Sequence, residues 1–144
     1  MSTPSAIVES LMTSMTEHRW ESAEALLADD FVFAGPVPQP IPKAAFLAVE
    51  KAIHGAMDDW DYALRVVEEH GGVVKTVIRI TAKHARTLAL PMPGFAPVHA
   101  RGAAIALPEE PTTFVVKGGK VARIDVAEIP GGGVGGLLAQ IAAG

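Results

Sequence analysis

The spacing of hydrophobic residues changes once along the chain, near Asp61, from the period of a helix to the period of a strand. Before that point, apolar residues such as Leu11 and Met15 recur at helical spacing, as on the buried face of an amphipathic helix. After it, Tyr62 and Leu64 alternate with outward-facing residues, as in a strand with one buried face. Helices followed by a block of strands predict an α+β domain in which the helices pack on a curved antiparallel sheet.

Three helices are predicted in the first part of the chain. The first begins after the N-cap residue Thr3, which Pro4 follows at the first helical position, and continues to about His18. The second covers about residues 20–28, and the third begins at Pro42. We expect the apolar face of each helix to be buried.

The predicted sheet has one short early strand and four strands in the second half: Phe31–Phe33, a strand from Asp61, Val73–Thr87, Thr112–Lys117 and Lys120–Ile129. Gly118-Gly119 joins the last two as a two-residue hairpin. Three prolines make Gly35–Pro40 a loop. The proline-rich segment Pro91–Pro97 is predicted to be an apolar lid, and the glycine-rich segment Pro130–Gly144 a flexible tail.

Composition limits the classes of protein to which the chain can belong. Its 144 residues suit one domain over residues 1–144, and 49% hydrophobic against 19% charged residues excludes intrinsic disorder. A formal net charge of −4 without a basic cluster argues against a nucleic-acid partner. The absence of cysteine excludes disulfides and thiolate metal sites. With no secretion signal and no apolar run that could span a bilayer, we expect a cytoplasmic protein with no membrane partner.

Two motifs are similar to those of a known superfamily. The segment Ala25–Phe31 (ALLADDF) precedes a proline, and the segment Phe114–Val121 (FVVKGGKV) contains the hairpin glycines. Both resemble motifs of the nuclear-transport-factor-2-like superfamily, with the SnoaL-like polyketide cyclase branch as the best match. The resemblance implies a cystatin-like α+β cone, in which three N-terminal helices pack on a sheet that wraps around a pocket. It does not imply one reaction, because the superfamily includes isomerases, cyclases, hydrolases and binding modules.

The catalytic residues of better-known enzymes in this superfamily are missing from the matching positions. In the ketosteroid isomerase pattern the base falls on Gly35, the tyrosine on Leu11 and the oxyanion aspartate on about Thr112. Glycine cannot abstract a proton and leucine cannot donate a hydrogen bond. The arginine–aspartate pattern of limonene-type epoxide hydrolases is also absent. The aspartate of SnoaL-like cyclases falls on Val126, so Asp125 takes that role only if a β-bulge shifts the strand by one residue.

Strand alternation predicts which side chains face the interior of the cone. The residues expected to contact a ligand are Leu11, Met15, Phe33, Tyr62, Ile80, Thr112, Phe114, Ile124 and Val126. The catalytic candidates are His84, Glu128 and Asp125, since an imidazole beside a carboxylate can exchange protons near neutral pH. The alternative is that His84 and Glu128 are solvated strand ends with no chemical task. His54 lies off the apolar face of the third helix and is predicted to be exposed.

An acidic segment and the outward-facing charged residues of the strands are predicted to have structural roles. The acidic segment Asp58–Asp61 has no matching histidine ligands, so it is predicted to cap the third helix, and no metal site is expected. The outward-facing strand residues Lys75, Arg79, Arg123 and Asp125 stand among apolar neighbours. Because members of this fold commonly pair through that face, the resemblance implies a homodimer through the outer face of the sheet.

These observations predict a small-molecule-binding protein with an apolar pocket for a hydrophobic, cyclic ligand. If the protein is an enzyme, we expect cyclisation, isomerisation or hydration without a cofactor, because the chemistry of this fold is proton transfer in a dry cavity. The alternative is a non-catalytic binding or dimerisation module of the same fold. The sequence leaves both open.

Overall fold

The computed structural model describes residues 2–35, 37 and 39–143, which form four helices and nine strands. In chain order these are α1 (Pro4–Thr16), α2 (Trp20–Ala25), β1 (Leu27–Ala34), β2 (Ile41–Pro42), α3 (Lys43–Ala56), β3 (Met57–Asp61), β4 (Arg65–His70), β5 (Val73–Ile78), β6 (Thr81–His84), β7 (Ala104–Ala106), β8 (Glu110–Lys117), β9 (Lys120–Val126) and α4 (Gly133–Ala143). Pro36 and Pro38 of the predicted loop, and Gly144 at the end of the predicted tail, lie outside the described residues.

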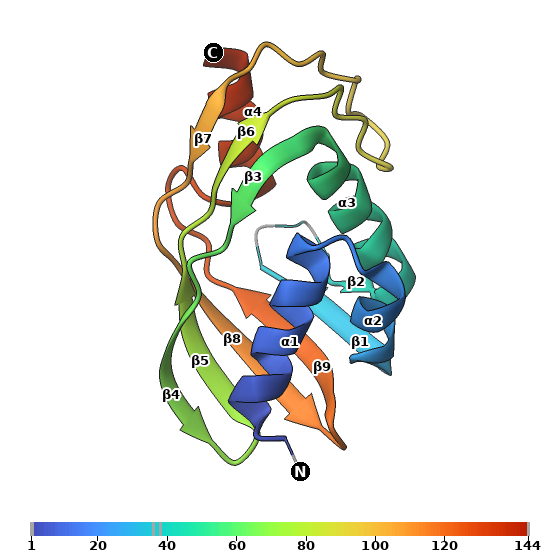
Figure 1. Cartoon of the computed structure of the whole chain (residues 1–144), viewed down its shortest axis with the longest axis vertical. Coiled ribbons are helices and arrows are strands. Elements are labelled where there is room, and N and C mark those ends of the chain that lie inside the picture. Colours follow the sequence, from blue (N-terminus) through green and yellow to red (C-terminus); the bar gives the residue numbers. More distant parts are fainter. Residues whose placement is uncertain (1, 36, 38, 144) are drawn as a thin grey trace.

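The strands form a six-stranded sheet, in the order β2-β1-β9-β8-β5-β4, and a three-stranded sheet, in the order β3-β6-β7. Every pair is antiparallel except β1 and β9, which run parallel with Phe33 opposite Ile124. The predicted α+β class is therefore confirmed, with a mixed rather than a purely antiparallel sheet. α1, α2 and α3 lie on one side of the sheet, and the two termini lie at opposite ends of the molecule (Figure 1).

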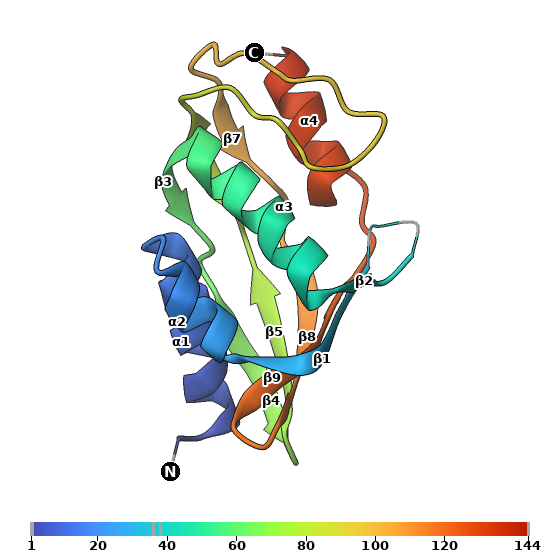
Figure 2. The ribbon, with the colours of Figure 1, turned by 90° about the vertical axis from the view of Figure 1, so that its right-hand side faces the viewer.

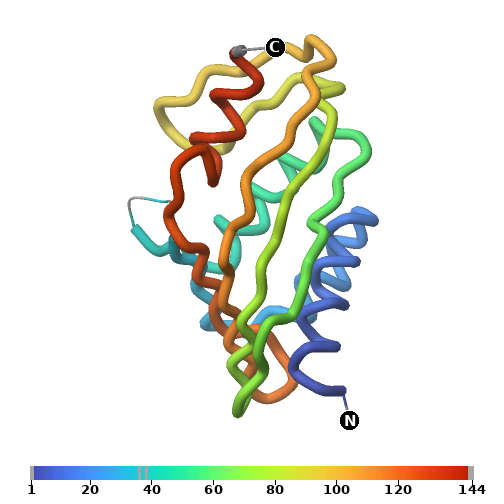
Figure 3. Tube along the Cα trace, turned by 90° about the vertical axis from the view of Figure 1, so that its left-hand side faces the viewer, coloured from blue at the N-terminus to red at the C-terminus, as the bar shows by residue number. Residues whose placement is uncertain are grey.

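The six-stranded and the three-stranded sheet continue into each other as one bent layer. The backbone N–H of Arg79, between β5 and β6, donates to the Tyr62 carbonyl, and the N–H of Leu107 donates to the Ile80 carbonyl, both at 2.8 Å. Three neighbouring chain paths, which run side by side (Figure 3), are thus interrupted between β3 and β4, β5 and β6, and β7 and β8. The prediction of one continuous strand over Val73–Thr87 is wrong, because this bend divides it into β5 and β6.

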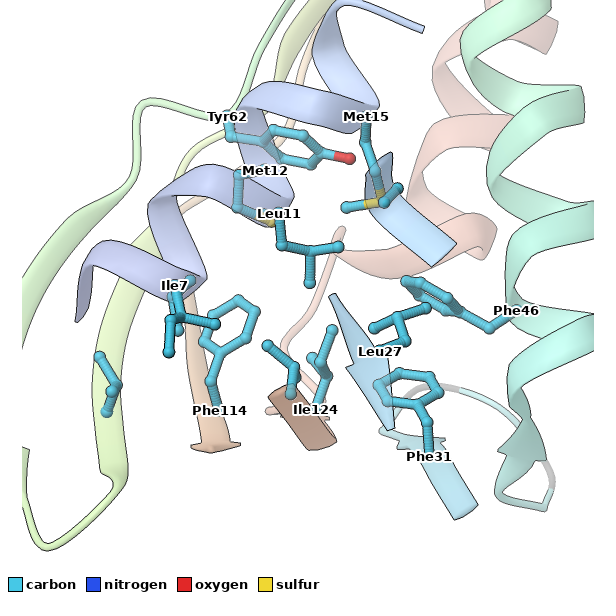
Figure 4. Packing of buried hydrophobic residues seen from close by; sticks show 14 of the residues in the cluster. Ile7, Leu11, Met12, Met15, Leu27, Phe31, Phe46, Tyr62, Phe114 and Ile124 are labelled. Carbon is cyan, nitrogen blue, oxygen red and sulfur yellow. The ribbon is translucent and has the colours of Figure 1, made fainter. Parts of the chain in front are cut away.

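The main core lies between α1, α3 and the six-stranded sheet. Leu11 from α1, Phe114 from β8 and Phe31 from β1 are almost completely buried there, and their side chains converge (Figure 4). A second cluster packs α3 and α4 against the three-stranded sheet around Leu88 and Ile105. The alternation predicted for the strands holds in β5, where Val74, Thr76 and Ile78 are buried. In β9 the strict alternation is broken: Val121 is fully buried although it is three residues from buried Ile124, and β8 and β9 shift register between Val115 and Val116.

Two helix ends differ from prediction. α1 ends at Thr16, and His18 then adopts a positive φ of 58° in the turn toward α2. α2 ends at Ala25, because the segment from Leu27 is already extended and pairs with β9 opposite Val121. The early strand is therefore eight residues long rather than the predicted three residues of Phe31–Phe33.

The glycine-rich tail is a helix rather than a flexible end. α4 packs across the end of the bent layer beside β7 (Figure 2). Its residues Leu137 and Ile141 are buried against that layer. The Gln140 side chain pairs with the backbone of Ala106 in both directions: its Oε1 accepts from the N–H at 2.8 Å and its Nε2 donates to the carbonyl at 2.7 Å. These contacts offset the weak helix propensity of glycine.

Two neighbouring glycines in α4 provide a test of this packing. A Cβ at Gly136 would overlap the backbone carbonyl oxygen of Gly131, whereas a Cβ at Gly135 would meet nothing. We expect Gly136→Ala to lower the free energy of unfolding in urea, and Gly135→Ala to raise it by up to about 1 kcal/mol. Equal gains from both substitutions would contradict the described packing of α4.

No helix in the described part of the chain is long and apolar enough to cross a membrane.

Candidate functional site

A cavity of about 110 Å³, partly open to solvent, lies within the cone, between α1, α3, α4 and the concave side of the bent sheet. Most of its wall is apolar. The polar side chains on the wall include Glu50, Tyr62, Glu110 and Thr112. The apolar part of the wall includes four residues from the helices, five from the strands and one, Ile80, from the link between β5 and β6: Met12, Met15, Phe46, Val134, Phe33, Ile78, Phe114, Ile124, Val126 and Ile80.

Most of the residues predicted to contact a ligand lie on this wall. They are Met15, Phe33, Tyr62, Ile80, Thr112, Phe114, Ile124 and Val126. Leu11 is completely buried in the main core, but it is not among the residues described around the cavity. Figure 4 shows Met15, Tyr62, Phe114 and Ile124 directed toward the same interior region.

The three catalytic candidates lie elsewhere. His84 is 0% exposed, but it belongs to β6, and neither ring nitrogen has a hydrogen-bond partner among the described residues. Asp125 accepts a hydrogen bond from Arg123 Nε at 2.8 Å on the outer side of β9, and Glu128 is exposed beyond the end of that strand. Since none of the three contributes to the cavity wall, the expected pairing of His84 with Glu128 inside the cone does not form.

Glu110, at the start of β8, is the carboxylate that the sequence analysis missed. It is 3% exposed and lies on the cavity wall. Its Oε1 accepts a hydrogen bond of 2.9 Å from the backbone N–H of Gly133, the first residue of α4. Burial raises the pKa of Glu110 above its ordinary value of 4.5, and this hydrogen bond offsets part of the rise.

The glycines before α4 make room for this carboxylate. A Cβ at Gly132 would lie 2.9 Å from Glu110 Oε1, a separation at which one of the two would have to move. The loop can therefore approach Glu110 closely enough for Gly133 to donate its N–H, at the end of the helix where backbone donors lack partners within the helix. The other oxygen, Oε2, makes no hydrogen bond with the described residues.

A second polar group on the wall connects α3 to the bend of the sheet. The Tyr62 hydroxyl and His54 Nε2 are 2.7 Å apart, and the same nitrogen lies 3.4 Å from Glu50 Oε2, one turn earlier on α3. His54 is 0% exposed, so the prediction of a surface histidine is wrong. Trp60 covers the imidazole at a ring separation of 4.5 Å, which explains how a residue off the apolar face of α3 becomes buried.

The surroundings of Tyr62 hold its hydroxyl in the protonated state. Burial raises the pKa of Tyr62 well above its ordinary value of 10.0, and the negative charge of Glu50 raises it further. The neighbouring indole N–H of Trp60 acts in the opposite direction. At neutral pH the phenol therefore keeps its proton.

This state can be checked directly, because Tyr62 is the single tyrosine of the chain. We expect no tyrosinate absorbance in the folded protein at about pH 10, where a free tyrosine is half ionised. The raised pKa also means that the contribution of Tyr62 to stability is complete below about pH 10 and is lost at higher pH, as the folded form begins to titrate. A native titration midpoint equal to that of the denatured chain would contradict the described burial.

The acidic segment after α3 is a strand and not a helix cap. Met57–Asp61 forms β3, which places Trp60 on the cavity wall. Asp58 accepts a hydrogen bond from Arg86 Nη2 at 2.7 Å, and Asp61 accepts one from the Ala63 N–H at 2.8 Å. Within the described ranges, no group of three or more His, Cys, Asp or Glu side chains could hold a metal ion.

A more open pocket adjoins the cavity on the other side of Tyr62. Met12 and Tyr62 line both, so these two side chains separate the interior from the outer pocket. The outer pocket lies between α1 and the turn after β3, and its carboxylates are Glu9, Glu17 and Asp61. The predicted lid Pro91–Pro97 contributes no residue to either pocket, whereas α4 closes one side of the cavity with Gly133, Val134 and Leu137.

The sequence pattern of the SnoaL-like domain matches residues 8–124, and the chain therefore belongs to the SnoaL-like family. No functionally curated protein matches the chain. The matched segment contains Glu50, Tyr62 and Glu110, while the closing helix α4 lies beyond it.

Solved structures confirm the nuclear-transport-factor-2-like fold. A candidate polyketide cyclase from Pseudomonas putida KT2440 has a TM-score of 0.73 at 15% identity, over 98% of this chain and 99% of that chain. An NTF2-like protein from Cytophaga hutchinsonii has a TM-score of 0.58 at 15% identity, over 88% and 89%. An LEH-like epoxide hydrolase from M. tuberculosis has a TM-score of 0.65 at 12% identity, over 96% and 88%. At these identities the likeness concerns the fold alone.

Proposed function

We propose that the protein binds a small, mainly apolar molecule inside the cone and exchanges a proton with it through Glu110. The observation that carries the proposal is a carboxylate, 3% exposed and with one oxygen unbonded within the described residues, on the wall of an otherwise apolar cavity. Buried cavities with few polar groups are the usual form of small-molecule sites. A carboxyl group with a raised pKa is suited to general acid–base work.

The size of the cavity limits the ligand. A cavity of about 110 Å³ is smaller than the roughly 300–1,000 Å³ of typical drug-sized sites. It is closer to the engineered cavity of about 150 Å³ that binds benzene. We therefore propose a ligand with one ring or a short branched chain, and a larger cyclic molecule would require α4 to move.

Proton exchange on a small ketone tests the proposal without knowledge of the natural substrate. In deuterated buffer, the Glu110 carboxylate would take a proton from the α-carbon of cyclohexanone, and the resulting carboxylic acid, after exchange with solvent, would return a deuteron to that carbon. We expect the protein to accelerate deuterium incorporation measured by NMR, and Glu110→Gln to lower the protein-dependent rate by about 10²-fold or more.

The control is Glu109→Gln, which changes the neighbouring glutamate. Glu109 is exposed and pairs with Arg65 at 3.2 Å, so its replacement should leave the exchange rate unchanged. Binding of cyclohexanone without any exchange above the buffer rate would favour the non-catalytic binding module.

We also propose that the protein is cytoplasmic and that it forms a homodimer through the outer face of the sheet. The outer face carries Lys75 and Arg79, and Val67 on β4 is 58% exposed, but Arg123 and Asp125 pair with each other within the chain. Sedimentation velocity at micromolar concentration should give a dimer, and a clean monomer would contradict the pairing of copies.

A further inference from the structure

We infer that the ligand of this cavity carries a positive charge, as a small primary amine attached to an apolar ring or chain. The inference rests on the proposed function only in placing a ligand inside the cone. It adds the chemical class of that ligand, which the charges around the cavity indicate.

The first reason is the sign of the charges on the wall. Glu50 and Glu110 both line the cavity, and no lysine, arginine or histidine is described there. Glu50 has a side-chain neighbour beside the cavity, because its Oε2 lies 3.4 Å from His54 Nε2. Glu110 has no ion pair among the described residues, and its only hydrogen bond is the one from the Gly133 N–H.

The second reason is the carboxylate oxygen of Glu110 that has no hydrogen-bond partner among the described residues. Oε1 accepts from Gly133, whereas Oε2 makes no hydrogen bond with the described residues, although the residue as a whole is only 3% exposed. A buried carboxylate without a cation is costly, and an ammonium group on the ligand would supply both the missing charge and the missing donor. An anionic ligand would instead place two negative charges together in an apolar site.

The third reason is the aromatic content of the wall. Phe33, Phe46, Trp60 and Tyr62 all line the cavity, and aromatic faces attract cations more strongly where water is excluded. Aromatic faces beside a carboxylate are a favourable environment for an ammonium group that remains attached to an apolar body.

The outer pocket extends the same charge pattern to the surface. Glu9, Glu17 and Asp61 line it, and it contains no basic side chain among the described residues, although Arg19 pairs with Glu17 at 2.9 Å from beside it. Because Met12 and Tyr62 line both spaces, a cation approaching the cavity from that side would pass the carboxylates of the outer pocket.

Binding of three ligands of one shape tests the inference. Isothermal titration calorimetry of the full chain at neutral pH would compare benzylamine, toluene and benzoate, which share one ring and differ in charge. We expect benzylamine to bind about tenfold or more tightly than toluene, and benzoate not to bind. Glu110→Gln should abolish the advantage of benzylamine over toluene, while Glu109→Gln should leave that advantage unchanged.

The outcomes separate this inference from the proposed function. If toluene binds and benzylamine binds no more tightly, or if benzoate binds best, the inference of a positively charged ligand is overturned. The proposal that the cavity binds a small molecule would still hold. If benzylamine keeps its advantage in Glu110→Gln, the cation does not lie at Glu110 and the inference is overturned. If none of the three binds, the cavity is not a ligand site and both proposals fail.

Discussion

Replacement of Glu110 by glutamine is expected to stabilise the protein at about pH 8 and to leave its stability nearly unchanged at about pH 4. Burial raises the pKa of Glu110, so the folded state favours the protonated carboxyl group. That contribution is complete below the unfolded pKa, and it is lost as the pH rises through the folded pKa. Glutamine keeps an oxygen for the Gly133 N–H but carries no charge at any pH, so the variant avoids the loss.

Thermal unfolding across this pH range measures the effect. Glu109→Gln is the matched control, since its carboxylate is 63% exposed and its pairing with Arg65 should contribute only about 0–1 kcal/mol. A destabilised Glu110→Gln protein at about pH 8 would show that the carboxylate is structural. A stabilised variant that no longer exchanges protons would indicate a group kept for function at a cost to stability.

The second large effect is expected from Leu137→Ala in α4. Leu137 is 2% exposed and lies on the cavity wall, so its truncation should cost about 2–5 kcal/mol of unfolding free energy in urea. The same change enlarges the cavity, and we expect the variant to bind a two-ring molecule such as naphthalene that the wild-type protein excludes.

Leu138→Ala is the control for this prediction. Leu138 is half-buried in the second core cluster and does not line the cavity, so it should lose less stability and keep the ligand size limit of the wild type. If Leu138→Ala admitted naphthalene as readily as Leu137→Ala, the described position of α4 would be wrong.

Local patterns were sufficient to predict much of the cavity wall. Residues two apart on a strand face the same side of the sheet. The inward direction of Phe114 therefore predicts that Thr112 also points inward, and Ile124 predicts the same for Val126. The same alternation extends two residues back from Thr112 to Glu110. Glu110 was missed because the predicted strand begins at Thr112, whereas β8 begins at Glu110 and includes Pro111, which only removes one donor from the ladder.

The buried His54 could not be predicted from the helix alone. Apolar periodicity places His54 beside the hydrophobic face of α3, and what covers it is Trp60 from β3 and Trp20 from α2. These contacts depend on how distant elements pack. For the same reason the tail was misread: glycine content argues against a helix, and only packing of Leu137 and pairing of Gln140 with Ala106 make α4 favourable.

The bend of the sheet had a similar cause. Residues 73–87 carry strand-like alternation throughout, so no local signal ends β5 at Ile78. The interruption follows from the neighbouring strands, which break beside it at Tyr62 and Leu107. Because Tyr62 and Ile80 both lie at this bend and on the cavity wall, the bend places the polar hydroxyl inside the cone.

The central claim is that the interior of the cone, beside Glu110, receives a small apolar ligand. A crystal of the full chain soaked with bromobenzene tests it most directly, because the anomalous scattering of bromine locates the ligand without assumptions about its pose. We expect a single strong anomalous peak in the cavity lined by Phe33, Tyr62, Phe114 and Glu110. A cavity without that peak, or bromine bound only on the outer surface, would contradict it.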